Sequence, residues 1–236
     1  MAIEGARARA RAAVIAELTA EARRQLAEVG PAALSLRSVA RAAGMVSSGV
    51  YRYFASRDEL LTALIVESYD ELGAAAERAA NRHARKPPLD RWLATCRAVR
   101  RWGVDHPHEW ALVYGSPVPG YEAPLDTIVP AQRVTRTLVG VVADAACRGG
   151  LRTPVAGAEA VPAKLAAELE QINDVIGVEV VLTTDDLVRL LTAWSQVFGM
   201  ISLELFGQTA GAITAHEALF DATARTSGRL VGLRGR

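Results

Sequence analysis

The sequence predicts an all-α fold, and three observations support this. Ala, Leu, Arg and Glu dominate the 236 residues, while aromatic residues make up only 6% of them. No series of alternating apolar and polar residues punctuated by hairpin turns appears. Apolar residues recur instead at helical intervals of three and four. Half of the residues are hydrophobic, which excludes a disordered chain and allows a sizeable core.

The first predicted helix covers residues 10–29. Its apolar residues lie on one face, and these are Val14, Ile15, Leu18, Ala22 and Leu26. Gly30 followed by Pro31 predicts the end of this helix.

Two short helices, 35–44 and 47–54, are predicted next. Leu36, Val39 and Ala40 have helical spacing in the first, and Gly44 is the kind of residue that ends a helix. Ser47 or Ser48 can cap the second helix, whose apolar residues Val50 and Phe54 lie four apart. The pattern predicts a helix-turn-helix.

A longer helix is predicted over residues 57–82. Ser56 followed by Glu59 forms a capping box, and Leu60 and Leu61 come directly after it. A helix start therefore follows the helix-turn-helix with almost no intervening chain.

The second short helix has a polar face of residue types that can reach phosphate oxygens and base edges in a major groove. This face consists of Ser47, Ser48, Gly49, Tyr51, Arg52 and Tyr53. Spacing alone does not distinguish a DNA-binding element from a solvated surface hairpin.

The residue types decide in favour of DNA binding, because over about residues 10–70 the chain resembles the DNA-binding domain of TetR-family transcriptional regulators. The resemblance rests on Gly44, the Ser47-Ser48-Gly49 cap, the Tyr51-Arg52-Tyr53 triplet and the run FASRDELL from Phe54 to Leu61. Arg57 is a departure, since Lys is more frequent there in the family, but Arg keeps a donor for phosphate.

Roles within this segment follow from side-chain chemistry. Arg52, Tyr51 and Tyr53 are predicted to contact the groove, with Arg52 suited to pair with a guanine edge. The residues predicted to hold phosphates are Ser35, Arg37, Ser47, Ser48 and Arg57.

The net charge of +1 conceals an uneven distribution along the chain. Residues 1–57 contain nine arginines and four glutamates, a net charge of +5, which leaves −4 for the remainder. This distribution predicts that DNA is bound within residues 1–57. The TetR resemblance implies that residues 58–236 form a helical effector-binding and dimerisation domain.

Helical spacing predicts further helices after residue 88. They cover 89–105, 107–114, 125–148, 184–207 and 214–230. Residues 115–124 are rich in Pro and Gly and predict a loop, and Thr184 is a candidate cap. Residues 150–183 are less regular, with one helix predicted at 165–176.

The penultimate helix is apolar nearly all round, so its residues cannot all face one core. The TetR resemblance implies that the last two helices form a four-helix bundle across a two-fold axis. The residues predicted at this dimer interface are Trp194, Val197, Phe198, Ile201, Leu205 and Phe220. A helix buried within its own domain is the alternative.

The resemblance also implies a small-molecule pocket in the second domain. Candidate lining residues are Trp92, Cys96, Trp102, Trp110, Tyr114 and Arg133. Spacing does not separate a pocket wall from ordinary core packing, which is the more frequent role of aromatic residues.

Neither a metal site nor an enzyme is predicted. Cys96 and Cys147 lie far apart in sequence and fit buried thiols, while His106 and His108 do not share a helix face. No cofactor or catalytic motif is present. Without a signal peptide or a membrane span, a cytoplasmic location is expected.

The sequence thus predicts a homodimeric, ligand-responsive repressor of the TetR type, which binds double-stranded DNA at an inverted repeat and is released by a small molecule. The alternative is a dimeric DNA-binding protein that does not respond to a ligand. A ligand-binding protein without useful DNA affinity fits less well, because the Ser-rich second helix is intact.

Overall fold

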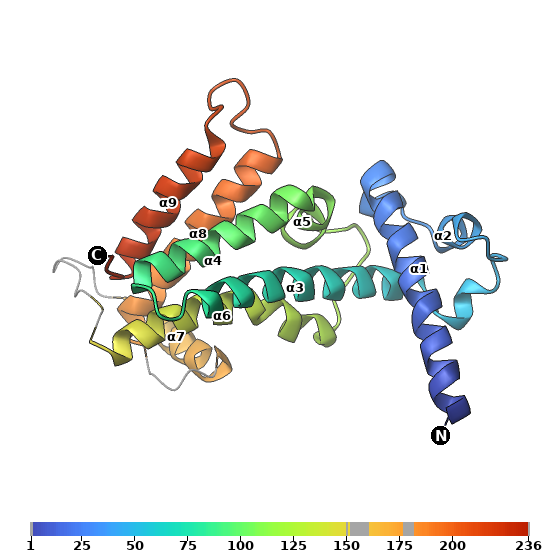
Figure 1. The fold of residues 1–236 in the computed structure, drawn as a ribbon, viewed down its shortest axis with the longest axis horizontal. Coiled ribbons are helices and arrows are strands. Elements are labelled where there is room, and N and C mark those ends of the chain that lie inside the picture. Colours follow the sequence, from blue (N-terminus) through green and yellow to red (C-terminus); the bar gives the residue numbers. More distant parts are fainter. Residues whose placement is uncertain (1, 150, 152–160, 177–181, 236) are drawn as a thin grey trace. The chain divides into compact units, whose positions relative to one another are not determined.

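The computed structural model describes residues 2–149, 151, 161–176 and 182–235. Within these ranges the regular elements are α-helices and short 3₁₀ helices, together with one isolated β-bridge between Leu151 and Leu233 (Figure 1). The predicted all-α fold is confirmed. None of the described helices is long and apolar enough to cross a bilayer.

The chain forms two compact units. The first unit is Met1–Asp70 with His106–Pro130, and the second is Glu71–Asp105 with Ala131–Arg236. Residues 106–130 thus pack with the N-terminal region, an association that local sequence patterns do not predict. The functional division after residue 57 stays a prediction.

The first unit is built from the helices α1 (Ala2–Ala33), α2 (Leu36–Ala42) and α5 (Pro107–Tyr114), with the beginning of α3 (Arg57–Arg82). Gly30 interrupts α1 with a φ of 73°, which agrees with the predicted helix end. A left-handed backbone of this kind is open to Gly because it has no Cβ.

One hydrophobic core joins these elements. Leu18 and Leu26 of α1, Val39 of α2 and Leu61 of α3 are almost fully buried in it. Leu112 of α5 belongs to the same core, and α5 contacts α1 directly. The helix-turn-helix therefore rests on a core that includes a segment far along the chain.

The turn after α2 is sharply defined. Gly44 adopts a φ of 68°, its N–H donates to the carbonyl of Arg41, and the Met45 N–H donates to that of Ala40. This Schellman motif satisfies the last carbonyls of α2. The predicted role of Gly44 as a helix stop is confirmed.

The second helix of the predicted pair is shorter than expected. In place of an α-helix over 47–54, the structure has a turn followed by a 3₁₀ helix at Val50–Arg52, preceded by Gly49 with no side-chain cap. The prediction that Ser47 or Ser48 caps an α-helix is therefore wrong. Gly49 is a poor helix former, so local propensity favours the turn.

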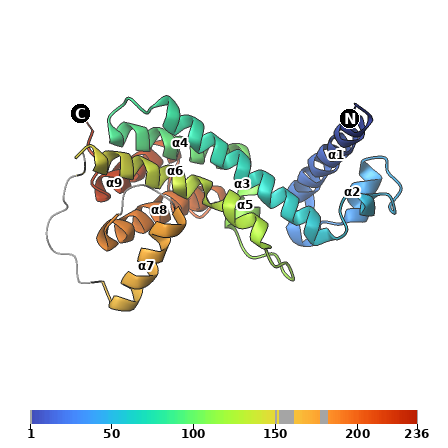
Figure 2. The same cartoon turned by 90° about the horizontal axis from the view of Figure 1, so that it is seen from below.

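The second unit contains the remainder of α3 with α4 (Pro88–Asp105), α6 (Ile128–Cys147), α7 (Ala163–Ile176), α8 (Thr184–Leu205) and α9 (His216–Leu230). Helices α4, α8 and α9 lie side by side, and α7 packs on α8 (Figures 1 and 2). These bounds differ from the predicted ones by at most a few residues.

Buried polar contacts hold α4 against α8 and α9. The Trp92 indole N–H donates to the carbonyl of Ala224 at 3.0 Å. The Arg100 guanidinium donates two hydrogen bonds, of 2.8 and 2.6 Å, to the Glu204 carboxylate. The two side chains are only 18% and 16% exposed. Such paired, partly shielded bonds fix the register of neighbouring helices.

The start of α8 corrects one detail of the sequence analysis. Thr183, not Thr184, is the N-cap, and it forms a reciprocal capping box with Asp186. In the region predicted to be irregular, α7 confirms the expected helix at 165–176. The rest of that region falls partly on residues 150, 152–160 and 177–181, which lie outside the described residues.

Candidate nucleic-acid interface and interior sites

The side chains predicted to meet DNA are mostly exposed. Tyr51 is 48% exposed, and Arg52, Arg37, Ser35 and Ser48 are exposed as well. Ser35 is the N-cap of α2 but makes no side-chain capping bond, so its hydroxyl is available to a phosphate oxygen. Ser47, Gly49 and Tyr53 are half-buried.

Arg52 has an exposed side chain and a backbone carbonyl that is held by a hydrogen bond. No hydrogen bond or ion pair to its guanidinium occurs among the described residues. Its carbonyl accepts a bond of 2.8 Å from Nη1 of Arg11, and the Arg11 guanidinium lies 5.3 Å from the ring centre of Tyr53. Arg11 of α1 thus supports the turn that presents Arg52.

Arg11 was absent from the residues predicted for this site. Its sequence position lies forty-one residues before Arg52, and no local motif connects the two. The available sequence signal was that Arg11 belongs to the arginine-rich N-terminal segment.

Arg57 has a structural role that the sequence analysis did not foresee. Its guanidinium donates to the carbonyls of Leu34 at 3.1 Å and Pro31 at 2.7 Å. These bonds tie the start of α3 to the connection between α1 and α2. Its predicted contact with phosphate stays a prediction.

The six residues predicted to line an effector pocket fall into both units. Trp92, Cys96 and Trp102 are buried in the second unit, whereas Trp110 and Tyr114 belong to the first. Burial raises the pKa of Tyr114, and its ring packs 4.6 Å from that of Trp110.

Arg133, the sixth candidate, forms a paired contact inside the second unit. Its guanidinium donates to both carboxylate oxygens of Glu77, at 2.9 and 2.7 Å, and this bond holds the pKa of Glu77 below its usual range. Its methylene groups lie close to Gly73, where an added Cβ would be 2.6 Å from the Arg133 Cβ. Arg133 therefore fastens α6 to α3.

An apolar cavity of about 160 Å³ lies among α6, α7 and α8. None of the six predicted pocket residues lines it. Its walls are Thr135, Leu138, Leu169, Leu187, Leu190, Leu191 and Trp194. Of these, only Trp194 was singled out from the sequence, and it was assigned to a dimer interface.

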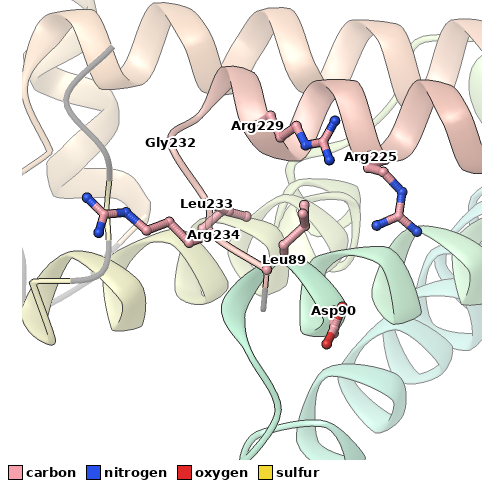
Figure 3. A pocket seen from close by; sticks show the side chains of 8 residues that line it. Leu89, Asp90, Arg225, Arg229, Gly232, Leu233 and Arg234 are labelled. Carbon is pink, nitrogen blue, oxygen red and sulfur yellow. The ribbon is translucent and has the colours of Figure 1, made fainter.

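A second hollow, of about 700 Å³, is basic and lies between the start of α4 and the end of α9 (Figure 3). Arg225, Arg229 and Arg234 line it together with Leu89 and Asp90. The three arginines are exposed, so water screens their charges.

The residues predicted at a dimer interface differ in their exposure. Val197, Phe198, Ile201 and Phe220 are 5% exposed or less, so they pack within their own unit. Their burial agrees with the alternative that the helix is covered by its own domain. The outward side of α8 instead carries Thr192, Ser195, Gln196 and Gly199, which are all exposed, and Phe206 directly after the helix is exposed as well.

The two cysteines differ as well. Cys96 is fully buried, and desolvation raises the pKa of its thiol. Cys147 is exposed, so the expectation of a buried thiol is wrong there. It lies at the end of α6, where the helix meets solvent. Among the described residues, no group of three or more His, Cys, Asp or Glu could hold a metal ion.

An exposed turn of basic and aromatic side chains, held on a small helical core in a chain with a further helical unit, defines a helix-turn-helix DNA-binding protein. Residues 18–64 match the family model for bacterial regulatory proteins of the tetR family. Residues 92–227 match the model for the tetracyclin repressor-like C-terminal domain. The chain belongs to the TetR family of DNA-binding transcriptional regulators.

Relatives support the same assignment. HTH-type transcriptional regulators of Mycobacterium bovis and Mycobacterium tuberculosis are 41% identical to this chain over 225 residues, which is 94% of this chain and 93% of theirs. The family and these relatives are regulators of transcription.

Solved structures show the same fold. The regulatory protein SCO4313 matches with a TM-score of 0.73 at 32% identity, covering 93% of this chain and 97% of that one. The TetR-family regulator PfmR of Thermus thermophilus matches with a TM-score of 0.57 at 20% identity, covering 92% and 97%. RolR in complex with resorcinol has a TM-score of 0.53 at 14% identity, with coverage of 96% and 91%.

Proposed function

We propose that this regulator is a homodimeric repressor that binds an inverted repeat in double-stranded DNA and is released by a small molecule. The observation that carries the proposal is that the Arg52 side chain is exposed while its backbone carbonyl is held by a hydrogen bond. Its backbone is anchored by Arg11, while its guanidinium is exposed and has no partner among the described residues. Because the backbone of Arg52 is already held, pairing with a base has to order only its side chain.

The neighbouring side chains divide into two kinds of contact. Tyr51 and Arg52 reach the groove, with Gly49 allowing close approach of the backbone and Tyr53 acting partly through Arg11. Phosphates are held by the exposed Ser35, Arg37 and Ser48, with Ser47 beside them and Arg57 supporting the segment. Phosphate contacts position the protein but carry little sequence information.

Dimerisation uses α8 and α9 in this proposal. Trp194 and Leu205 are half-buried in the single chain, and the exposed stripe of α8 is composed largely of small side chains around Gly199. An added Cβ at Gly199 would meet nothing within 4 Å. Such a stripe lets a second helix approach closely, while the buried residues beneath it support its shape.

Ligand response is supported by the apolar cavity in the second unit. Proteins place small-molecule sites in mostly apolar cavities between helices. The solved complex of RolR with resorcinol shows that a protein of this fold takes a small molecule. A ligand that binds the DNA-free conformation more tightly shifts the population away from the DNA-bound one.

The first test is selection of bound DNA from a random duplex library at near-physiological salt. We expect enrichment of an inverted repeat with two short half-sites. Binding that enriches no sequence and fades with rising salt would reduce the interaction to phosphate attraction and would overturn the proposal.

The ligand response needs a second test, a thermal-shift screen followed by titration of hits against the selected operator. A compound that stabilises the protein and lowers its affinity for the operator supports the repressor mechanism. Compounds that stabilise the protein without changing operator binding would favour the ligand-independent alternative.

A further inference from the structure

The apolar cavity among α6, α7 and α8 has walls of unusual uniformity. Leu138, Leu169, Leu187 and Leu190 are each 5% exposed or less, and none of the described residues that line the space is charged. Among the described lining residues, only Thr135 and Trp194 have polar side-chain atoms. Leu191, which is 42% exposed, marks where the cavity approaches solvent.

Trp194 carries a second, independent observation. Its indole Nε1 is buried and makes no hydrogen bond to any described residue. The ring is held in place by stacking on Phe198, with centroids 4.6 Å apart and planes inclined by 24°. Buried indole N–H groups ordinarily donate to an acceptor. The Trp194 N–H is therefore a buried donor that a bound molecule with an acceptor atom could satisfy.

We infer that this cavity binds a small, uncharged, single-ring molecule whose carbonyl or hydroxyl oxygen accepts a hydrogen bond from the Trp194 indole. The inference deepens the proposed function, on which it rests for its regulatory meaning, by assigning the effector's location and chemical class. The binding itself is independent of DNA.

Cavity size sets the upper limit on the ligand. Apolar cavities of about 150 Å³ stay dry and accept a benzene-sized molecule. The cavity volume of about 160 Å³ therefore suits one ring with a small substituent. A drug-sized ligand would need several hundred Å³.

Charge sets the chemical class. An ionised group placed against four buried leucines would lose its hydration without gaining a counter-charge. An organic anion is better accommodated by the basic hollow, where the exposed guanidinium groups of Arg225, Arg229 and Arg234 supply counter-charge (Figure 3). The two sites therefore select opposite ligand classes.

Three probes of nearly equal size and shape test the inference. Acetophenone offers a carbonyl oxygen as hydrogen-bond acceptor. In α-methylstyrene an apolar methylene group replaces that oxygen, and in benzoate a carboxylate replaces the whole acetyl group. Binding to the 236-residue protein is followed by calorimetry and by the indole N–H signals of its four tryptophans in a ¹⁵N-labelled sample.

We expect acetophenone to bind and to shift one indole signal, that of Trp194, identified by its loss in the Trp194→Phe variant. This variant should bind acetophenone roughly three- to tenfold more weakly, the range that one hydrogen bond contributes. Its affinity for α-methylstyrene should change less than twofold. Equal loss for both probes, or an unmoved Trp194 signal, would overturn the assigned donor.

A matched pair of variants tests the location. Leu191→Trp places a large side chain at the mouth of the cavity and should abolish probe binding. Leu165→Trp, at an α7 position that is likewise 42% exposed but does not line the cavity, should leave it unchanged. Circular dichroism and size-exclusion chromatography establish that both variants fold and keep their oligomeric state.

The outcomes separate this inference from the proposed function. Failure of every uncharged probe to bind, in a protein that still selects an operator, overturns the cavity assignment and leaves the regulator intact. Binding of acetophenone without any change in operator affinity supports the cavity site and removes the effector role. Benzoate binding that disappears in Arg229→Ala locates the anion at the basic hollow and not in the cavity.

Discussion

At the scale of single residues, Arg37 and Arg52 are both exposed arginines of the first unit, yet we expect them to act differently. Arg37 lies in the first turn of α2, whereas Arg52 ends the 3₁₀ helix that Arg11 supports. Arg52→Ala should lower the affinity for the selected operator by about 1–3 kcal/mol and relax specificity at one base pair. Competition with a panel of single-base operator variants measures both effects.

Arg37→Ala is the matched comparison. As a phosphate contact it should weaken binding to operator and random DNA by the same factor and reduce the salt dependence of both. Equal losses on the two DNAs for Arg52→Ala would assign that residue to phosphate as well, and the groove contact would then be wrong.

The two cysteines make a residue-scale prediction that does not depend on DNA. Burial raises the pKa of the Cys96 thiol, so little of the reactive thiolate forms near neutral pH, while Cys147 is exposed. A disulfide reagent should modify one thiol per folded chain and both after denaturation. Rapid modification of Cys96 in the native protein would show that α4 opens readily.

At the scale of helices, Gly228 and Gly199 contribute in opposite ways. A Cβ at Gly228 of α9 would lie 2.6 Å from Leu89 Cδ1 and 2.8 Å from Trp92 Cδ1 of α4, whereas one at Gly199 of α8 would meet nothing. Gly228→Ala should destabilise the fold by about 1–3 kcal/mol through overpacking. Denaturant unfolding monitored by circular dichroism gives the value.

Gly199→Ala should instead stabilise the isolated subunit by about 0.5–1 kcal/mol, because Ala is the better helix former. If α8 is the dimer interface, the same methyl group obstructs close helix approach and weakens the dimer. Analytical ultracentrifugation over a dilution series distinguishes the two effects. An unchanged dimer constant would place the interface away from Gly199.

Helix boundaries were largely predictable because they depend on local chemistry. Gly44 and the capping box of Ser56 and Glu59 act within a few residues, and the structure confirms the helix stop and the bond from the Glu59 N–H to the Ser56 hydroxyl. The segment 47–54 was predicted as an α-helix because Val50 and Phe54 have helical spacing. That spacing is also compatible with the observed turn and 3₁₀ helix.

Interior sites were less predictable, because a cavity depends on which helix faces meet. The pocket was predicted mainly from large aromatic residues and from Arg133. In the structure, the Trp92 indole N–H donates to the carbonyl of Ala224, and the Arg133 guanidinium donates to Glu77. The observed cavity is lined mainly by leucines, which have no sequence signature separating them from core. Only the unpaired indole of Trp194 distinguishes this site, and hydrogen bonding cannot be read from spacing.

At the scale of the whole molecule, charge is divided between functions. The sequence concentrates a net charge of +5 in residues 1–57, where phosphate is to be met, and leaves the rest with −4. The basic groups outside that region include Arg97 and Arg100, which are neutralised by Asp221 and Glu204. These two ion pairs connect neighbouring helices, and because each pair has no net charge, it does not add to the positive electrostatic potential that attracts DNA.

The proposed dimer makes the strictest whole-molecule prediction. Two identical recognition turns related by a two-fold axis must meet half-sites on the same face of the duplex, separated by about 34–36 Å or a multiple of it. Inserting about five base pairs, half a helical turn, between the selected half-sites rotates one of them to the opposite face. Affinity should then fall to that of a single half-site in an electrophoretic titration. Unchanged affinity for the inserted operator would mean that each subunit binds DNA independently, and the two-fold arrangement would have to be rejected.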